Sequence, residues 1–290
     1  MPGTILSYHT GLQAEVNLAL ISQRALTAAD AQAVAQAAAV LLPQVCRPDL
    51  YGLVQAHGRP HFPRPAVHLS LDGKLGNRRL FARLGLPHPD TLEFSGLEEA
   101  AAAWEAGQPA VTALGAPLVA KGAGDGMGRN VFLAKNPGEL RGLAGRLETA
   151  CLRGPSGLVL QRYIPGAAEM RVVLLHQDAQ AYWRWPAPGQ FRANLSQGGG
   201  WSKEGPAEQL AAGLALARRL QAAAGIDLAG LDLIFPPGQG PLLLEINFFF
   251  GRRGLGGSQG FLPRYLSAVR AWLAGLGLDP RRVSLAEDDL

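Results

Sequence analysis

From Pro241 to Gly257 the chain reads P-L-L-L-E-I-N-F-F-F-G-R-R-G-L-G-G. The leucines and isoleucine between residues 242 and 246 are typical of a strand. Glu245 and Asn247 are two residues apart, so a strand places both side chains on one face. A carboxylate beside an amide oxygen offers the hard ligands that Mg²⁺ accepts when nucleotide phosphates complete its coordination. The stretch therefore predicts a strand that carries metal-ligating side chains.

A second strand is predicted at residues 230–235, and residues 236–240 (P-P-G-Q-G) between the two strands are turn material. If the hairpin turns about Gly238-Gln239, Asp232 falls opposite Glu245. The two carboxylates and the nearby amide would then share a face within reach of one or two metal ions. The alternative is a surface hairpin with ordinary polar residues, and the rest of the chain must decide between them.

The composition is that of a globular protein. Of 290 residues, 48% are hydrophobic and 17% are charged, which excludes a disordered chain and allows one large domain or two to three subdomains. The net charge of +4 comes without a basic run, so no nucleic-acid footprint is indicated. Two cysteines offer neither a disulfide framework nor a metal motif. No signal peptide and no apolar run long enough for a membrane span is visible, so we expect a cytoplasmic protein that binds no membrane.

The pattern of helices and strands is mixed. Thr27 and Asp30 resemble a capping box that opens an alanine-rich helix running to about Leu42. Further helices are expected to end at Gly85 and Gly107, to run from Pro206 to Gly225, and to cover about 263–276. We expect a small α/β domain at residues 1–66, with an extended linker at 57–65. A second domain is expected at 67–290, with subdomains at about 110–162 and 163–278.

A glycine-rich loop follows the strand that ends near Lys121. Glycines at 122, 124, 126 and 128 would let backbone N–H groups approach phosphate oxygens, and Lys121 would add a point charge. The loop is neither a Walker A loop nor a dinucleotide fingerprint. A flexible hairpin is the alternative interpretation, and Lys74, at the start of its helix, has a solvated charge as its alternative.

The order of the motifs is more informative than any one of them. A lysine before a helix, the glycine loop, Q-R-Y-I-P-G, E-M-R, F-R-A-N, L-D-L-I and L-E-I-N follow one another along the chain. Over about residues 66–275 this order resembles the ATP-grasp superfamily, in the branch of glutathione synthetases and RimK-like ribosomal-protein glutamate ligases. The resemblance implies an α+β fold in which two subdomains hold ATP between them, preceded by the small α/β domain.

The resemblance also implies roles for particular residues. Nucleotide binding would use the two lysines, the loop and the segment that follows the next strand: Lys74, Lys121, Gly124, Gly126, Gly128, Gln161, Arg162, Tyr163, Ile164 and Glu169. Arg192 and Asn194 would flank the triphosphate as catalytic residues. The metal ligands would be Asp232, Glu245 and Asn247, holding one or two Mg²⁺ ions, with Mn²⁺ as a substitute.

The implied reaction is ATP-dependent ligation of a carboxylate to an amine through an acyl phosphate, on an amino acid or peptide. A phosphotransferase on the same fold and a non-catalytic ATP-binding protein are the alternatives. Relatives often dimerise, but no stretch of this chain indicates a homo-oligomer interface.

The chain departs from the branch at two places. Phe248 to Gly254 reads F-F-F-G-R-R-G where the branch usually has Ser-Pro-Gly, so the acceptor cannot be carried over. We expect Arg252 or Arg253 to hold an anionic group of the substrate, with Arg171 as a further candidate; a solvated arginine pair is the alternative. Arg162 also stands where the ribosomal-protein ligases often have an acid.

Overall fold

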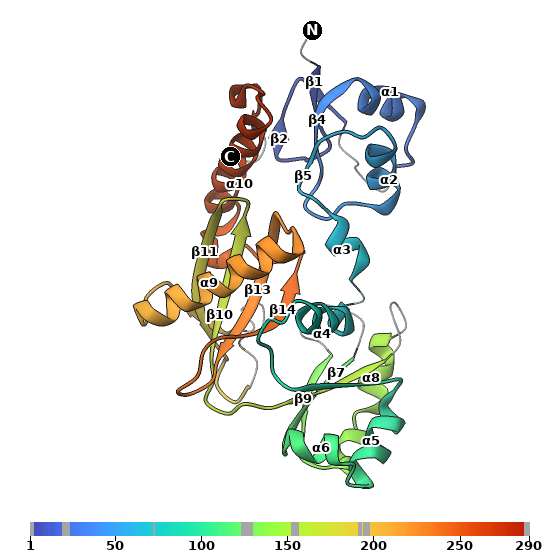
Figure 1. Cartoon of the computed structure of the whole chain (residues 1–290), viewed down its shortest axis with the longest axis vertical. Coiled ribbons are helices and arrows are strands. Elements are labelled where there is room, and N and C mark those ends of the chain that lie inside the picture. The colour runs from blue at the N-terminus through green and yellow to red at the C-terminus, as the bar shows by residue number, and fades with distance from the viewer. Residues whose placement is uncertain are drawn as a thin grey trace.

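The computed structural model describes residues 3–18, 24–71, 73–122, 130–147, 157–190, 193 and 198–286, and the backbone of residues 148–151. Figure 1 shows three parts along the long axis of the molecule. An N-terminal unit (blue) lies at the top beside helix α10 (Gly257–Gly275), a middle part contains one sheet and helix α9 (Ala207–Ala224), and a lower part (green) contains another sheet.

The N-terminal unit is built on a parallel sheet in the order β3-β1-β4-β5. Its elements are β1 (Thr4–Ser7), β3 (Val16–Asn17), α1 (Ala28–Gln36), β4 (Ala37–Leu41), α2 (Pro48–Ala56) and β5 (His61–Phe62). The short strand β2 (Leu12–Gln13) pairs with β15 (Ser284–Leu285), which follows the 3₁₀ turn η4 (Pro280–Arg282) near the other end of the sequence. The α/β character expected for this region is confirmed.

Two predictions in this unit are wrong. The alanine-rich helix ends at Gln36, and residues 37–41 form β4. Because β4 lies between β1 and β5, with Val40 and Leu41 fully buried, strand pairing overrides the preference of alanine for helices. Residues 57–65 are not simply an extended linker either, since they include β5, whose Phe62 is fully buried.

The lower part has an antiparallel sheet in the order β6-β9-β7-β8. Its elements are β6 (Thr91–Phe94), α5 (Leu97–Glu105), α6 (Pro109–Leu114), β7 (Leu118–Gly122), β8 (Val131–Ala134), α7 (Pro137–Arg141), α8 (Ala144–Cys151) and β9 (Leu158–Arg162). Alternate residues such as Leu118 and Ala120 pack in one core with residues of these helices. The other face, with Val119 and Lys121, points toward the middle part and lines the cavity described below.

The middle part has an antiparallel sheet in the order β12-β11-β10-β13-β14. Its strands are β10 (Ala168–Leu175), β11 (Asp178–Trp185), β12 (Gly200–Ser202), β13 (Leu228–Phe235) and β14 (Leu242–Asn247). Met170 and Val172 of β10 share a core with α9, whereas Val173, on the opposite face, shares one with α10. Beyond the reach of α10, this second face carries Glu169 and Arg171 and faces the lower part.

Helix α10 begins six residues earlier than predicted, at Gly257 rather than Pro263. Pro263 lies inside the helix, where a proline removes one backbone hydrogen bond. However, Phe261 is fully buried and stacks on Tyr265 with ring centroids 5.6 Å apart. This packing extends the helix upstream, to the 3₁₀ turn η3 (Arg253–Leu255).

Helices α3 (Ala66–Ser70) and α4 (Gly73–Arg83) connect the parts, and α4 bridges the two antiparallel sheets. The Asn77 side-chain oxygen accepts the N–H of Ile246 in β14 at 3.0 Å. On the other side, Arg78 and Arg79 pair with Glu93 of β6. Within the described residues, no helix is long and apolar enough to cross a membrane.

Candidate nucleotide and metal site

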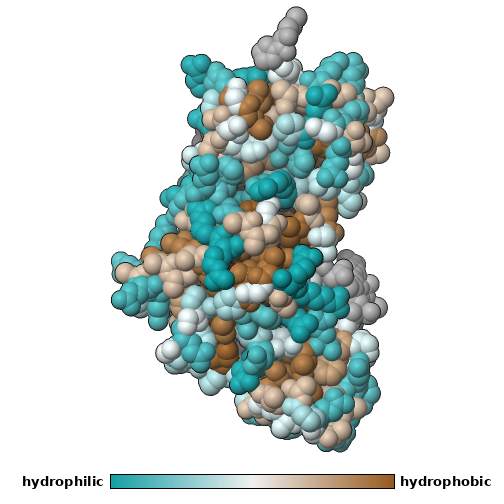
Figure 2. Space-filling view, in the orientation of Figure 1, coloured by the Kyte–Doolittle hydropathy of each residue, from teal (hydrophilic) through white to brown (hydrophobic). Residues whose placement is uncertain are grey.

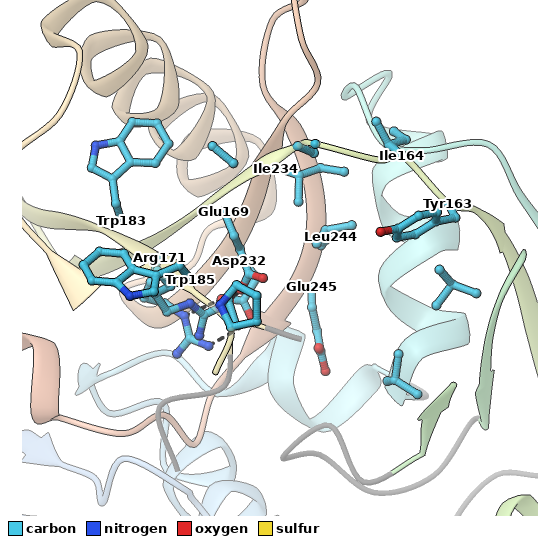
Figure 3. A pocket seen from close by; sticks show the side chains of 18 of the residues that line it. Tyr163, Ile164, Glu169, Arg171, Trp183, Trp185, Asp232, Ile234, Leu244 and Glu245 are labelled. Atoms are coloured by element: carbon cyan, nitrogen blue, oxygen red, sulfur yellow. Dashed lines mark hydrogen bonds and ion pairs between the residues drawn. The ribbon is translucent and has the colours of Figure 1, made fainter. Parts of the chain in front are cut away.

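A cavity of about 840 Å³ lies between the two antiparallel sheets. Side chains from β7, β9, β10, β11, β13 and β14 line it, and Figure 3 shows several of them from close by. Figure 2 shows apolar atoms gathered at mid-height of one face of the molecule, with hydrophilic atoms around them. The strands that bound the cavity belong to two different sheets and lie far apart in the sequence.

The β13–β14 hairpin places Asp232 directly opposite Glu245, as predicted, but by a different route. The turn is centred on Pro237-Gly238, with the Gln239 N–H donating to the Pro236 carbonyl at 3.1 Å and Gly238 at φ +69°. The pairs nearest the turn, Leu233 with Leu243 and Ile234 with Leu242, would by themselves put Asp232 opposite Leu244. A bulge between residues 232 and 233 inserts one extra residue in β14 and shifts the register to Glu245.

The bulge also determines which side chains face the cavity. Leu244 and Glu245, although consecutive, both line it, while Leu243 and Ile246 are buried. Asn247 lines the cavity as well. The three residues expected to bind metal therefore lie on one wall.

Tyr182, Arg171, Asp232 and Glu245 form one row across four neighbouring strands, each directly opposite the next. Residues in such a row share a face of the sheet. In the adjacent row, Arg184 of β11 lies opposite Glu169 of β10. The two rows together place two arginines beside the carboxylates.

Asp232 is the centre of this network. Arg171 donates two hydrogen bonds to it, at 2.5 Å from Nε to Oδ1 and 2.9 Å from Nη2 to Oδ2. Arg184 donates to Oδ1 at 2.5 Å and also to Glu169, and the Asn247 amide donates to Oδ2 at 3.0 Å. Arg171, a candidate substrate residue in the sequence analysis, is therefore a hydrogen-bonding partner of Asp232 in the structure.

The two carboxylates of the row are in opposite electrostatic situations. Burial disfavours ionisation of Asp232, but the charges of Arg171 and Arg184 outweigh it and hold its pKa below the ordinary value. Burial, together with the negative charge of Asp232, raises the pKa of Glu245. Within the described part of the chain, no hydrogen bond to the Glu245 carboxylate is recorded, so its oxygens are available to a ligand.

Lys121 lines the cavity from β7, and Lys74 of α4 lies close enough to affect its pKa. Burial lowers the pKa of Lys121 to about 8; Lys74 lowers it further, and Glu245 and Asp232 oppose the shift. The Lys74 side chain is only 8% exposed and donates to the Gly122 carbonyl at 3.2 Å, so a solvated charge is excluded there. Both amines are held near the start of the glycine loop.

The residues expected to bind adenine, 161–164, lie at the cavity, but their side chains point in different directions. Gln161, Arg162, Tyr163 and Ile164 all line the cavity, and Figure 3 shows the Tyr163 ring on its wall. The Gln161 amide donates to Thr91 at 2.9 Å, which fixes it inside the sheet. Arg162 turns toward the surface and pairs with Asp90 and the Ala113 carbonyl.

Several predicted site residues are not in the described lining of the cavity. Gly124, Gly126, Gly128, Arg192 and Asn194 lie outside the described residues. Arg252 lies over the Phe261 ring at 4.2 Å and donates to Ser258, and Arg253 is an exposed residue of η3. These two arginines are not among the residues that line the cavity.

Sequence reasoning missed Arg184 and did not assign Trp185 to the site. Trp183 is buried against Phe235, and Trp185 lines the cavity with 48% of its surface exposed. Arg184 lies between these tryptophans and points to the opposite face. Its role depends on the pairing of β11 with β10, which the sequence pattern did not give.

The donor set fits a hard cation that is also bound by phosphates. Within the described residues, no group of three or more His, Cys, Asp or Glu side chains could hold a metal by itself. Glu245 and the side-chain oxygen of Asn247 offer hard oxygen ligands on one wall, so phosphate oxygens would have to complete the coordination.

Comparisons with known proteins agree with this geometry. Residues 72–258 match the family model of the RimK-like ATP-grasp domain. The probable alpha-L-glutamate ligase 1 of Shewanella amazonensis is 34% identical over 151 residues, which is 50% of this chain and 47% of that protein. N5-carboxyaminoimidazole ribonucleotide synthase of Synechococcus elongatus is 33% identical over 132 residues, 46% of this chain and 30% of that protein. The matched segment thus spans less than half the length of these curated relatives.

Two solved structures share the fold. A RimK domain ATP-grasp protein from Sphaerobacter thermophilus superposes with a TM-score of 0.60 at 19% identity, covering 91% of this chain and 97% of that one. D-alanine–D-alanine ligase from Bacillus anthracis, complexed with ATP, gives a TM-score of 0.59 at 18% identity, covering 87% of this chain and 79% of that one. The resemblance and the ATP-grasp fold predicted from the sequence are confirmed, and the fold family implies ATP binding. The chain belongs to the RimK-like ATP-grasp family.

Proposed function

We propose that the chain is an ATP-dependent ligase that joins a carboxylate to an amine. Its membership of the RimK-like family and the relatives named as glutamate ligases support this reaction class. The main structural support for the ligase reaction is the arrangement of charges in the cavity. Lys121 stands across from Glu245 and Asp232, close enough for both carboxylates to oppose the lowering of its pKa.

The reaction runs in two steps. An oxygen of the substrate carboxylate attacks the γ-phosphorus of ATP, the bond to the β-phosphate oxygen breaks, and ADP leaves. The amine nitrogen of the second substrate then attacks the acyl carbon of the resulting acyl phosphate. The carbon–oxygen bond to phosphate breaks, inorganic phosphate leaves, and the amine proton passes to solvent. Neither step needs a side-chain nucleophile, because positioning and charge stabilisation do the catalysis.

The residues have distinct tasks in this proposal. Lys74 and Lys121 hold phosphate oxygens together with the glycine loop, and the backbone of residues 161–164 binds adenine. Glu169 receives the ribose hydroxyls. Arg192 and Asn194 flank the transferring phosphoryl group, as the family resemblance implies.

Asp232, Glu245 and Asn247 would hold Mg²⁺ or Mn²⁺. The bound ion would supply positive charge to neutralise the transferring phosphoryl group. Asp232 stays ionised beside its arginines, and Glu245 would lose its proton more easily once a cation is near. The side-chain oxygen of Asn247 adds a neutral ligand.

We propose that the substrates are an amino acid or a peptide. The name of the Shewanella relative, a probable alpha-L-glutamate ligase, favours an amino acid as one of them. Arg252 or Arg253 would hold an anionic end of one substrate. Arg253 is the more exposed of the two side chains.

The test is ADP release in the presence of Mg²⁺-ATP and a panel of amino acids and peptides, with mass spectrometry of the product. A product that equals two parents less one water, formed with one ADP and one phosphate, supports ligation. A phosphorylated product without free phosphate would support the phosphotransferase instead. Nucleotide binding without any ADP release across the whole panel would contradict the enzyme. The Glu245→Gln variant is the inactive control.

A further inference from the structure

Arg184 occupies an unusual position at the metal-binding wall. Its side chain is 8% exposed, and its terminal nitrogen Nη2 is shared between Glu169 and Asp232. Its Nε is buried, and no residue in the described part of the chain accepts a hydrogen bond from it. A buried N–H group that has lost its hydration and makes no hydrogen bond is energetically unfavourable. The unused donor therefore indicates that an acceptor, such as a ligand oxygen, binds beside it.

The hydrogen bonds on Asp232 leave no place for a cation. Oδ1 accepts from Arg171 and Arg184, and Oδ2 accepts from Arg171 and Asn247. A carboxylate has about four acceptor positions, so all of them are taken. A metal ion can reach Asp232 only if one donor leaves.

Of the two arginines that neutralise Asp232, Arg184 is the better able to leave. Arg171 lies directly opposite Asp232 in the sheet and holds it through two bonds. Arg184 lies in the adjacent row, holds Asp232 through one bond, and keeps Glu169 as a second partner. Moving its guanidinium away from Asp232 therefore breaks one bond instead of two.

The charges around the cavity favour binding of the nucleotide before binding of the metal. Among the described residues that line the cavity, four cations balance four carboxylates: Lys121, Arg162, Arg171 and Arg184 against Glu169, Glu204, Asp232 and Glu245. A divalent ion alone would therefore add two positive charges that the lining does not balance. A triphosphate brings more negative charge than the ion brings positive, and its oxygens are strong acceptors for a guanidinium.

We propose that Arg184 is a gate that keeps metal off Asp232 until a triphosphate is bound. In the nucleotide-free protein the arginine neutralises Asp232. When the triphosphate enters, it draws the guanidinium away, and the metal takes the position that the arginine leaves. Arg184 is thus a positioning residue, and it makes metal binding conditional on nucleotide. This inference rests on the proposed nucleotide and metal site.

The test measures Mn²⁺ affinity of chelator-treated protein without nucleotide, by electron paramagnetic resonance of free Mn²⁺. Arg184→Met, which keeps the length of the stem, is expected to bind Mn²⁺ at least about tenfold more tightly than the wild type. Arg184→Gln should behave in the same way, so one variant remains informative if the other does not fold. With a non-hydrolysable ATP analogue present, the two proteins should differ by no more than about threefold.

Arg64→Met is the matched control. Arg64 also pairs with a buried aspartate, Asp227, but neither residue lines the cavity, and its loss should leave Mn²⁺ affinity unchanged. Equal Mn²⁺ affinity of the wild type and both Arg184 variants without nucleotide would overturn the gate. That outcome differs from failure of the proposed function, in which the wild type would bind neither the nucleotide nor Mn²⁺ in its presence.

Discussion

Lys121 should destabilise the ligand-free protein, because its charged amine loses hydration inside the cavity. Its pKa falls from 10.5 to about 8, chiefly through burial. Each pKa unit corresponds to about 1.4 kcal/mol, so charged Lys121 destabilises the fold by about 3 kcal/mol at neutral pH. Replacing it by methionine keeps an apolar stem of similar length and removes the charge. We expect Lys121→Met to raise the free energy of unfolding at pH 7 by as much as about 3 kcal/mol.

The pH dependence has a definite sign. Because the folded pKa lies below the unfolded one, the unfolded chain binds a proton that the folded chain lacks between about pH 8 and 10.5. Wild-type stability therefore rises with pH across that window relative to the variant. The advantage of Lys121→Met should be complete below pH 8 and should shrink toward zero near pH 10.5.

Urea unfolding followed by circular dichroism, in the presence of a chelator, measures both effects. The exposed Lys135→Met is the matched control and should change stability by less than about 0.5 kcal/mol. Lys121→Met should also weaken ATP binding, so stability and binding move in opposite directions. A variant that is less stable than the wild type at pH 7, or an advantage that does not change with pH, would refute the reasoning.

The other predictions concern the row of side chains and the arginine pair. Gly254→Ala should destabilise the chain by about 1–3 kcal/mol, since its Cβ would lie 2.4 Å from the Tyr182 ring; Gly251→Ala, with nothing within 4 Å, is the control for urea unfolding. Glu245→Gln should abolish ADP release and leave the free energy of unfolding within about 0.5 kcal/mol of the wild type or higher, because a desolvated carboxyl is removed. Loss of the fold would instead make Glu245 a structural residue. Arg253→Ala should raise the Michaelis constant of one substrate about tenfold or more, and unchanged constants for both substrates in Arg252→Ala and Arg253→Ala would exclude the substrate anchor.

The part of the fold that the sequence predicted well is local. The hairpin has turn residues between two apolar runs, and helix α9 begins after Pro206 and ends at Gly225, which is at φ +69°. These signals act within a few residues, so they can be read without the rest of the structure. The pairing of Asp232 with Glu245 was predicted correctly, although a shifted turn and a bulge combine to produce it.

The errors concern interactions across the chain. Residues 37–41 form a strand because β1 and β5 flank them, which their alanines do not indicate. Helix α10 starts early because Phe261 packs on Tyr265. Arg184 was missed because its meaning comes from Glu169 and Asp232, on two other strands. Motif order gave the family, but not the contacts that neutralise Asp232.

A structure of the protein with Mg²⁺ and a non-hydrolysable ATP analogue tests the central claim most directly. The account predicts the triphosphate in the cavity between the two sheets, with Lys121 on one side and the ion bound by Asp232, Glu245 and Asn247 on the other. Nucleotide bound elsewhere, or bound in the cavity with no ion near Glu245, would contradict it.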